Sequence, residues 1–186
     1  PVRLPGEARR EAFVAALFVR GSALDQVLLH VEAIRVLAFS TRVHSLRPRP
    51  FLVVTDGLLP PEASQGLKAD GITLLELQND DLSFARTNAY GASEEGDLAK
   101  LQLASWWLER GVAPTAVKLA IWNLTAYDCL VFLDADTLLM DSVDELFEME
   151  TFASGLNPYS THGMTHNGEK FANPGINTGV MVLQPS

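Results

Sequence analysis

CLVFLDADTLLMDSVDELF, residues 129–147, joins an unbroken apolar run to two aspartates that lie two positions apart. A short apolar run that contains Val and Phe is typical of a strand buried on both faces. Side chains two residues apart on a strand point to the same side, so we expect Asp134 and Asp136 to lie next to each other. Two neighbouring carboxylates repel unless a cation, a shared proton or open water offsets their charge. The stretch therefore predicts a buried strand that ends in two carboxylates whose charge is offset by a cation, a shared proton or open water.

Upstream of this strand, apolar runs alternate with segments of helical periodicity. Residues 11–20 read EAFVAALFVR, which predicts a first strand, and residues 24–41 repeat apolar side chains at helical spacing. A strand at 51–55, a short helix at 60–67 and a strand at 72–77 follow. This alternation is typical of an open α/β fold, a mostly parallel sheet with helices on both faces.

The downstream half predicts further helices and strands. We expect a loop at 79–96, helices at 98–110 and 116–124, the strand 129–133, a short helix from Ser142 to Phe147, a long surface loop at 153–175 and a last strand at 176–183. The sequence contains no internal repeat or low-complexity tract, so residues 1–186 are predicted to form one domain.

The composition fits one globular domain. The chain has 186 residues, 47% of them hydrophobic, and a formal net charge of −9. So acidic a chain lacks the basic surface that general binding to nucleic acid or to anionic membranes requires. It has no apolar stretch of the ~18 residues that would predict a membrane span. The single cysteine, Cys129, allows no internal disulfide, and its place in the apolar run predicts a small buried side chain.

The residues alone leave three interpretations of the aspartate pair open. In the first, Asp-Ala-Asp-Thr is a turn whose carboxylates accept hydrogen bonds from backbone N–H groups. In the second, VFLDADTLL resembles the haloacid-dehalogenase signature of phosphatases, with Asp134 as nucleophile, Asp136 as general acid and a magnesium ion between them. That signature also requires a downstream lysine and acidic pair, whereas Lys170 is the one lysine after Asp136 and no acidic pair follows Glu150. In the third, the carboxylates hold Mn²⁺ or Mg²⁺ for the diphosphate of a nucleotide-sugar, at the strand end where open α/β sheets bind ligands.

Two blocks of the sequence carry a more specific signal. Residues 118–147 read KLAIWNLTAYDCLVFLDADTLLMDSVDELF, and residues 171–186 read FANPGINTGVMVLQPS. Together, and in this order, they resemble the core of the glycogenin-like glycosyltransferases, family 8. The resemblance covers roughly residues 110–186 and implies a single open sheet of the GT-A, Rossmann-like type. It also implies retaining transfer of a hexosyl group from a UDP-sugar to a hydroxyl of a carbohydrate or protein acceptor, with Mn²⁺ as cofactor and Mg²⁺ as the alternative.

The resemblance also implies roles for individual residues. Asp134 and Asp136 would ligate the metal, and the backbone around Ala135 would face the ribose. Lys118 and Arg110 would contact the donor, and Asn177 and Thr178 would hydrogen-bond the transferred sugar. Gly179 would admit the ligand close to the backbone.

The chain departs from the family at two places. Residues 16–19 read ALFV where the family has small polar residues and a tyrosine around the uracil and ribose. The family's third metal ligand, a histidine in a His-x-x-Gly-x-x-Lys block, would follow Ser186, and His162 and His166 do not occupy its place. We therefore expect a catalytic domain that is incomplete at its C-terminus and binds the donor weakly by itself. The alternative is a non-catalytic nucleotide-sugar-binding module of the same fold.

Overall fold

A computed structural model of the chain describes a sheet and the helices that flank it. It covers residues 8–19, 22–55, 57, 59–77, 118, 120–157, 164–166, 169–171 and 175–185. The predicted loop at 79–96 and the predicted helix at 98–110, with Arg110, lie outside these ranges.

The predicted strands and the first two predicted helices are present, with small shifts in their ends. The elements in chain order are β1 (Glu11–Leu17), α1 (Leu24–His44), β2 (Phe51–Thr55), α2 (Pro61–Ala69), β3 (Ile72–Glu76), the 3₁₀ helix η2 (Ile121–Asn123), β4 (Cys129–Leu133), the 3₁₀ helix η3 (Asp144–Glu148), β5 (Ala153–Asn157), β6 (Met164–His166), β7 (Glu169–Phe171) and β8 (Gly175–Leu183). None of the helices in the described ranges is long and apolar enough to cross a bilayer.

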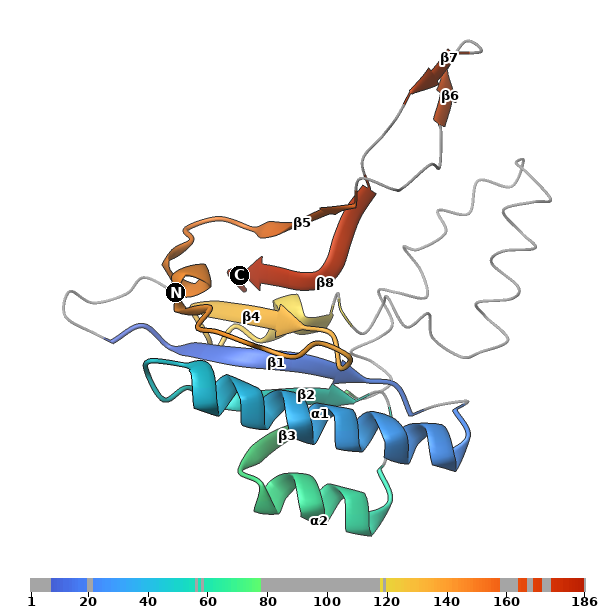
Figure 1. The fold of residues 1–186 in the computed structure, drawn as a ribbon, viewed down its shortest axis with the longest axis vertical. Helices are drawn as coiled ribbons and strands as arrows, with labels where there is room; N and C mark the ends of the chain where they lie inside the picture. The colour runs from blue at the N-terminus through green and yellow to red at the C-terminus, as the bar shows by residue number, and fades with distance from the viewer. Residues whose placement is uncertain are drawn as a thin grey trace.

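Six strands form one open sheet in the order β3-β2-β1-β4-β8-β5 (Figure 1). β1 pairs in parallel with β2 and with β4, and β2 pairs in parallel with β3. β8 runs antiparallel to β4, and β5 runs antiparallel to β8. The sheet is therefore open and mostly parallel, as predicted, and β8 runs in the direction opposite to the other strands.

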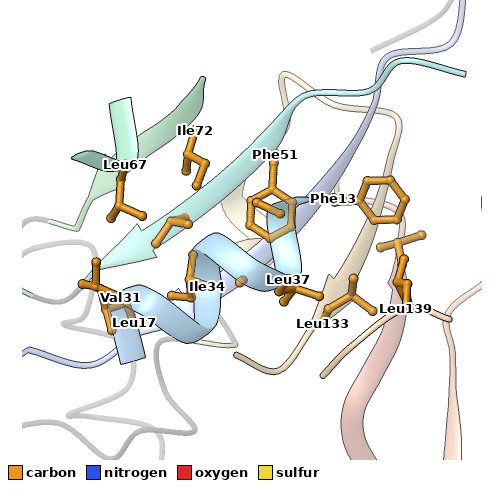
Figure 2. Close-up of a cluster of buried hydrophobic side chains, with 14 of the residues drawn as sticks. Phe13, Leu17, Val31, Ile34, Leu37, Phe51, Leu67, Ile72, Leu133 and Leu139 are labelled. Atoms are coloured by element: carbon orange, nitrogen blue, oxygen red, sulfur yellow. The ribbon is translucent and has the colours of Figure 1, made fainter. Parts of the chain in front are cut away.

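The core has two layers because β1, β2 and β4 are buried on both faces. α1 and α2 cover one face, where Ile34 and Leu37 of α1 pack among side chains from the strands, including Phe13 and Phe51 (Figure 2). Ala120, with Ile121 and Trp122 of η2, covers the other face. Full burial of an apolar side chain such as Ile34 or Leu37 stabilises the folded state by about 1.5–3 kcal/mol.

The cysteine in β4 is one of these core residues. Cys129 is fully buried, as predicted, and burial raises the pKa of its thiol. The side chain therefore serves as a small hydrophobic group in the layer that α1 and α2 cover.

The predicted surface loop at 153–175 is wrong in part. Ala153–Asn157 form the edge strand β5, and Met164–His166 pair with Glu169–Phe171 in a two-stranded hairpin that stands away from the sheet (Figure 1). β5 reads ASGLN, which has neither alternation nor an apolar run. Its strand conformation comes from hydrogen bonding to β8, a contact between distant parts of the sequence.

Two predicted helices contain tighter 3₁₀ turns in their described residues. In the predicted helix 116–124, Lys118 and Ala120 are helical and η2 ends the segment, where the N–H of Leu124 bonds the carbonyl of Ile121. The predicted helix from Ser142 to Phe147 is the 3₁₀ helix η3. One of these 3₁₀ turns precedes β4 and the other follows it, and such turns are common at helix ends and in connections.

A buried arginine joins three elements at the amino edge of the sheet. The side chain of Arg49, which is 4% exposed, contacts Glu11 in β1 at 2.8 Å and pairs with Asp144 in η3. Its guanidinium also lies 4.0 Å from the centre of the Phe147 ring. Arg49 therefore anchors η3, which follows the aspartate pair in sequence, to the start of β1.

Replacing Arg49 by methionine tests this anchor. Arg49→Met keeps much of the aliphatic volume but leaves the carboxylates of Glu11 and Asp144 without their buried cation. We expect the free energy of unfolding to fall by about 3–5 kcal/mol, because two largely buried carboxylates lose the cation closest to them. Urea denaturation followed by circular dichroism measures the change.

Arg35→Met is the matched control. Arg35 also contacts two carboxylates, those of Glu32 and Asp70, but its side chain is 39% exposed. Exposed pairs contribute little, so we expect a clearly smaller loss of stability. Equal losses for the two variants would contradict the anchoring role of Arg49.

Candidate active site

The topology brings the two sequence blocks together at the carboxyl edge of the sheet. β4 ends there, and because β8 is antiparallel to β4, the first half of β8 lies beside that end. Leu133 pairs with Val180, and the N–H of Asp134 donates to the carbonyl of Gly179 at 2.8 Å. The aspartate pair and the Asn-Thr-Gly segment, more than forty positions apart in sequence, are thus neighbours in the fold.

The aspartate pair lies on a turn and not on a strand face, which corrects the expectation from periodicity. β4 stops at Leu133, and the N–H of Thr137 donates to the carbonyl of Asp134 at 2.9 Å, which closes a turn. Asp134 is partly exposed and Asp136 is exposed. Because of this turn, the two side chains do not follow the alternation of a strand, yet both line the same pocket.

Lys118 supplies a positive charge to this turn. Its Nζ lies 2.7 Å from Oδ1 of Asp134 and donates to Oγ1 of Thr178 at 3.2 Å. The lysine side chain is 15% exposed, and its Nζ lies 4.9 Å from the centre of the Phe132 ring. Lys118 therefore links the end of β4 to β8, which is not the behaviour of a solvated helix lysine.

β8 bulges where it passes the aspartates. β5 pairs Ser154 with Met181 but Gly155 with Asn177, so residues 178–180 of β8 have no counterparts in β5. A bulge of this kind bends a strand and redirects its side chains, and Figure 1 shows β8 curving away from β4 in this part. The bulge lets Thr178 reach Lys118.

Gly179 is required for space at this bulge. Its N–H donates to Oδ1 of Asn177 at 2.8 Å. A Cβ at this position would lie 3.1 Å from that oxygen and 3.4 Å from Oδ2 of Asp134. The missing side chain therefore lets β8 pass close to Oδ2 of Asp134, while Lys118 contacts the other carboxylate oxygen.

A pocket of about 330 Å³ lies at this edge of the sheet. It is lined by residues from the turn after β4, from β8, from the segment around Lys118, from the end of β1 and from α1. These are Ala16, Leu17, Phe18, His30, Lys118, Asp134, Ala135, Asp136 and Thr178. The volume is within the range of small-ligand sites.

Most of the predicted site residues meet in or beside this pocket. Lys118, Thr178 and the Asp-Ala-Asp turn line it, and Asn177 and Gly179 lie next to them on β8. Arg110 and His162 lie outside the described residues. His166 is in β6, in the hairpin that stands away from the sheet (Figure 1).

His30 lines the pocket and was missed from the sequence. Val27, Ile34 and Leu37 on α1 are buried at helical spacing, and His30 falls on the same stripe but is exposed. α1 begins at the edge where β1 ends, so its early turns can reach the pocket. The sequence signal that could have identified His30 is a polar residue in an otherwise apolar helical stripe, on a helix that begins at this edge of the sheet.

The donor set of the pocket fits a hard divalent cation. Asp134 offers a partly exposed carboxylate whose Oδ2 lies beside Gly179, and Asp136 offers a second, exposed carboxylate. In the part of the chain that the structure describes, no group of three or more His, Cys, Asp or Glu residues surrounds a common point. A cation bound here would take its other ligands from water or a bound diphosphate.

Comparison with solved structures defines the class of fold. The galactosyltransferase LgtC, solved in complex with donor and acceptor sugar analogues, matches over 94% of this chain and 57% of that protein, with a TM-score of 0.53 at 16% identity. The bifunctional glycosyltransferase WbbM matches over 98% of this chain and 32% of that protein, with a TM-score of 0.51 at 12% identity. The chain has the GT-A fold, the open α/β sheet of these transferases.

Sequence comparison adds relatives of one kind, although no family model matches the chain. Mouse glycogenin-1 is 38% identical over 93 residues, which are 50% of this chain and 23% of that protein. Human glycogenin-2 is 42% identical over 72 residues, 39% of this chain and 12% of that protein. The Arabidopsis thaliana UDP-glucuronate:xylan alpha-glucuronosyltransferase 1 is 39% identical over 69 residues, 37% of this chain and 8% of that protein. Over these residues the chain is similar in sequence to glycogenin-like glycosyltransferases of family 8, and it spans about a quarter, or less, of the length of these relatives.

The close packing around Gly179 at the β8 bulge can be tested by substitution. Gly179→Ala would press a methyl group against Oδ1 of Asn177 and bring it into contact with Oδ2 of Asp134. We expect it to lower the free energy of unfolding by about 1–3 kcal/mol, as overpacking does elsewhere. Thermal and urea denaturation measure the loss.

Gly66→Ala is the control for this substitution. Gly66 lies inside α2, and a Cβ there would have no atom within 4 Å. Alanine favours the helix, so we expect this variant to be more stable than the wild type by about 0.5–1 kcal/mol. If Gly179→Ala were also stabilising, the close approach at β8 would be refuted.

Proposed function

We propose that this chain binds a UDP-sugar together with Mn²⁺, and that the protein transfers the hexosyl group, with retention, to a hydroxyl of an acceptor. The observation that carries the proposal is the Lys118–Asp134 pair beside Asp136 and Thr178 at the carboxyl edge of the sheet. Ligands of open α/β sheets bind at this edge. The sequence similarity to glycogenin-1 and to a glucuronosyltransferase supports the same reaction class.

The two aspartates would hold the metal. Asp134 would offer Oδ2, the carboxylate oxygen beside Gly179, and Asp136 would offer its exposed carboxylate. Carboxylate oxygens are the ligands that Mn²⁺ and Mg²⁺ prefer. When bound, the ion would stabilise negative charge on the nucleoside diphosphate as it leaves.

Lys118 would bind the diphosphate beside the metal. Its ammonium already lies between Asp134 and Thr178, at 2.7 Å and 3.2 Å from their oxygens. Low exposure strengthens its electrostatic attraction to a phosphate oxygen. The contact with Thr178 holds the lysine on the side of the pocket next to β8.

The bulge of β8 would position the transferred sugar. Asn177 and Thr178 carry polar side chains at the start of β8, one exposed and one half-buried. An amide and a hydroxyl can both donate and accept hydrogen bonds, as sugar hydroxyls require. Ala135, between the two aspartates, would place its backbone against the ribose.

Removing the carboxylates tests the metal site. We expect Asp134→Asn and Asp136→Asn each to weaken Mn²⁺-dependent UDP binding by about 100-fold, because a neutral amide is a poor ligand for a hard cation. Calorimetric titration of UDP with and without Mn²⁺ measures this, and release of UDP from UDP-hexoses follows turnover.

Asp141→Asn is the matched control, since Asp141 is exposed in the same connection and does not line the pocket. It should bind UDP like the wild type. Undiminished UDP binding by the double variant of Asp134 and Asp136 would falsify the metal site. Release of phosphate from an aryl phosphate with Mg²⁺ would instead favour the phosphatase interpretation.

Lys118→Met should move two affinities in opposite directions. Without the ammonium next to Asp134, Mn²⁺ alone should bind more tightly, because a repulsive charge is gone and Oδ1 is released. UDP in the presence of Mn²⁺ should bind about 10-fold more weakly, because a charge-assisted hydrogen bond to phosphate is lost.

Manganese electron paramagnetic resonance gives the first affinity and calorimetry gives the second. Lys68→Met, an exposed change in α2, is the control and should alter neither. A parallel loss of both affinities would show that Lys118 acts by supporting the fold and not by binding the donor.

A further inference from the structure

His30 is placed for contact with a ligand at the end of the pocket that lies away from β8. It lines the pocket from α1, and its side chain is exposed on a helix stripe whose other members are buried. Among the described residues, no hydrogen bond or ion pair involves its imidazole. Both ring nitrogens can therefore serve a bound molecule.

The sheet order fixes which part of a donor would lie near His30. β1 and β8 flank β4 on opposite sides. The pocket therefore runs from His30 and the end of β1, past Asp134 and Asp136, to Thr178 on β8. With the diphosphate at the aspartates and the sugar at β8, the nucleoside falls at the β1 end.

The wall at this end is otherwise apolar. Ala16, Leu17 and Phe18 line the pocket there, and His30 is the polar side chain among the described residues beside them. An apolar wall accommodates a base or ribose face but discriminates poorly between related molecules, whereas a placed hydrogen-bonding group discriminates strongly. His30 is the group at this end that can do so.

We propose that His30 binds the nucleoside of the donor and determines specificity for it, with its imidazole hydrogen-bonded to a polar edge of the nucleoside against the Leu17–Phe18 wall. The inference rests on the proposed function, because it takes the diphosphate to lie at the aspartates. It adds a residue from α1 to a site otherwise built from the sheet and the segment around Lys118.

Titration with two ligands tests this inference. UDP carries the nucleoside and inorganic pyrophosphate lacks it, and both are titrated by calorimetry with Mn²⁺ present. We expect His30→Ala to weaken UDP binding about 10-fold and to change pyrophosphate binding by less than about 2-fold. His30→Gln, which keeps a planar hydrogen-bonding group, should recover part of the UDP affinity.

His44→Ala is the matched control, because His44 lies in the last turn of α1 and does not line the pocket. It should leave both affinities unchanged, and melting curves of the variants establish that each is folded. Unchanged UDP binding in His30→Ala overturns the inference, and so does an equal loss of UDP and pyrophosphate. In both cases wild-type binding of UDP leaves the proposed function intact, whereas a wild type that binds neither ligand refutes both.

Discussion

The antiparallel pairing of β8 with β4 is the constraint on which the candidate site depends. It places the first residues of a late strand at the carboxyl edge, where the other strands of the parallel half end. A parallel strand in the same position would carry Asn177 and Thr178 to the amino edge, about 15 Å away across a five-residue neighbour. The bond from the N–H of Asp134 to the carbonyl of Gly179 fixes the alignment at the point where the pocket begins.

The electrostatics of the pocket follow from this alignment. Lys118 offsets one of two nearby carboxylates and is held in place by Thr178, so the pair of aspartates keeps an excess of one negative charge. That excess is what a divalent cation neutralises, and the ion would in turn attract a diphosphate. The cost of gathering two aspartates at a strand end, evident from residues 129–147 alone, is in this way met partly by a lysine of the same chain.

Those parts of the fold that depend on local pattern were predictable from the sequence. β1, β2 and β4 are buried on both faces, so each is a continuous apolar run that any strand analysis detects. β5 is a strand only because β8 hydrogen-bonds to it, and nothing in the sequence ASGLN predicts this pairing. The sequence identified the aspartate pair but not its turn, because β4 stops at Leu133, where its pairing with β8 ends.

The same limit applies to the residues of the site. Family resemblance was enough to select Lys118 and Thr178, whereas their mutual contact requires the register of β8. His30 carries no motif and lies on a helix that the resemblance covers only in architecture. Arg49 looks like an ordinary charged residue before a strand, and its burial between Glu11 and Asp144 follows only from the packed fold.

The segment that returns from the aspartate turn to η3 connects the two edges of the sheet. It is tied to the pocket by Thr137, to α1 by the N–H of Leu139 on Oγ of Ser40, and to the amino edge by Asp144 on Arg49. The turn that carries the aspartates thus has no stability separate from the rest of the domain. A genetic map of inactivating substitutions would accordingly show two centres, one around Asp134 and one around Arg49 at the opposite end of β4, although only the first would touch a ligand.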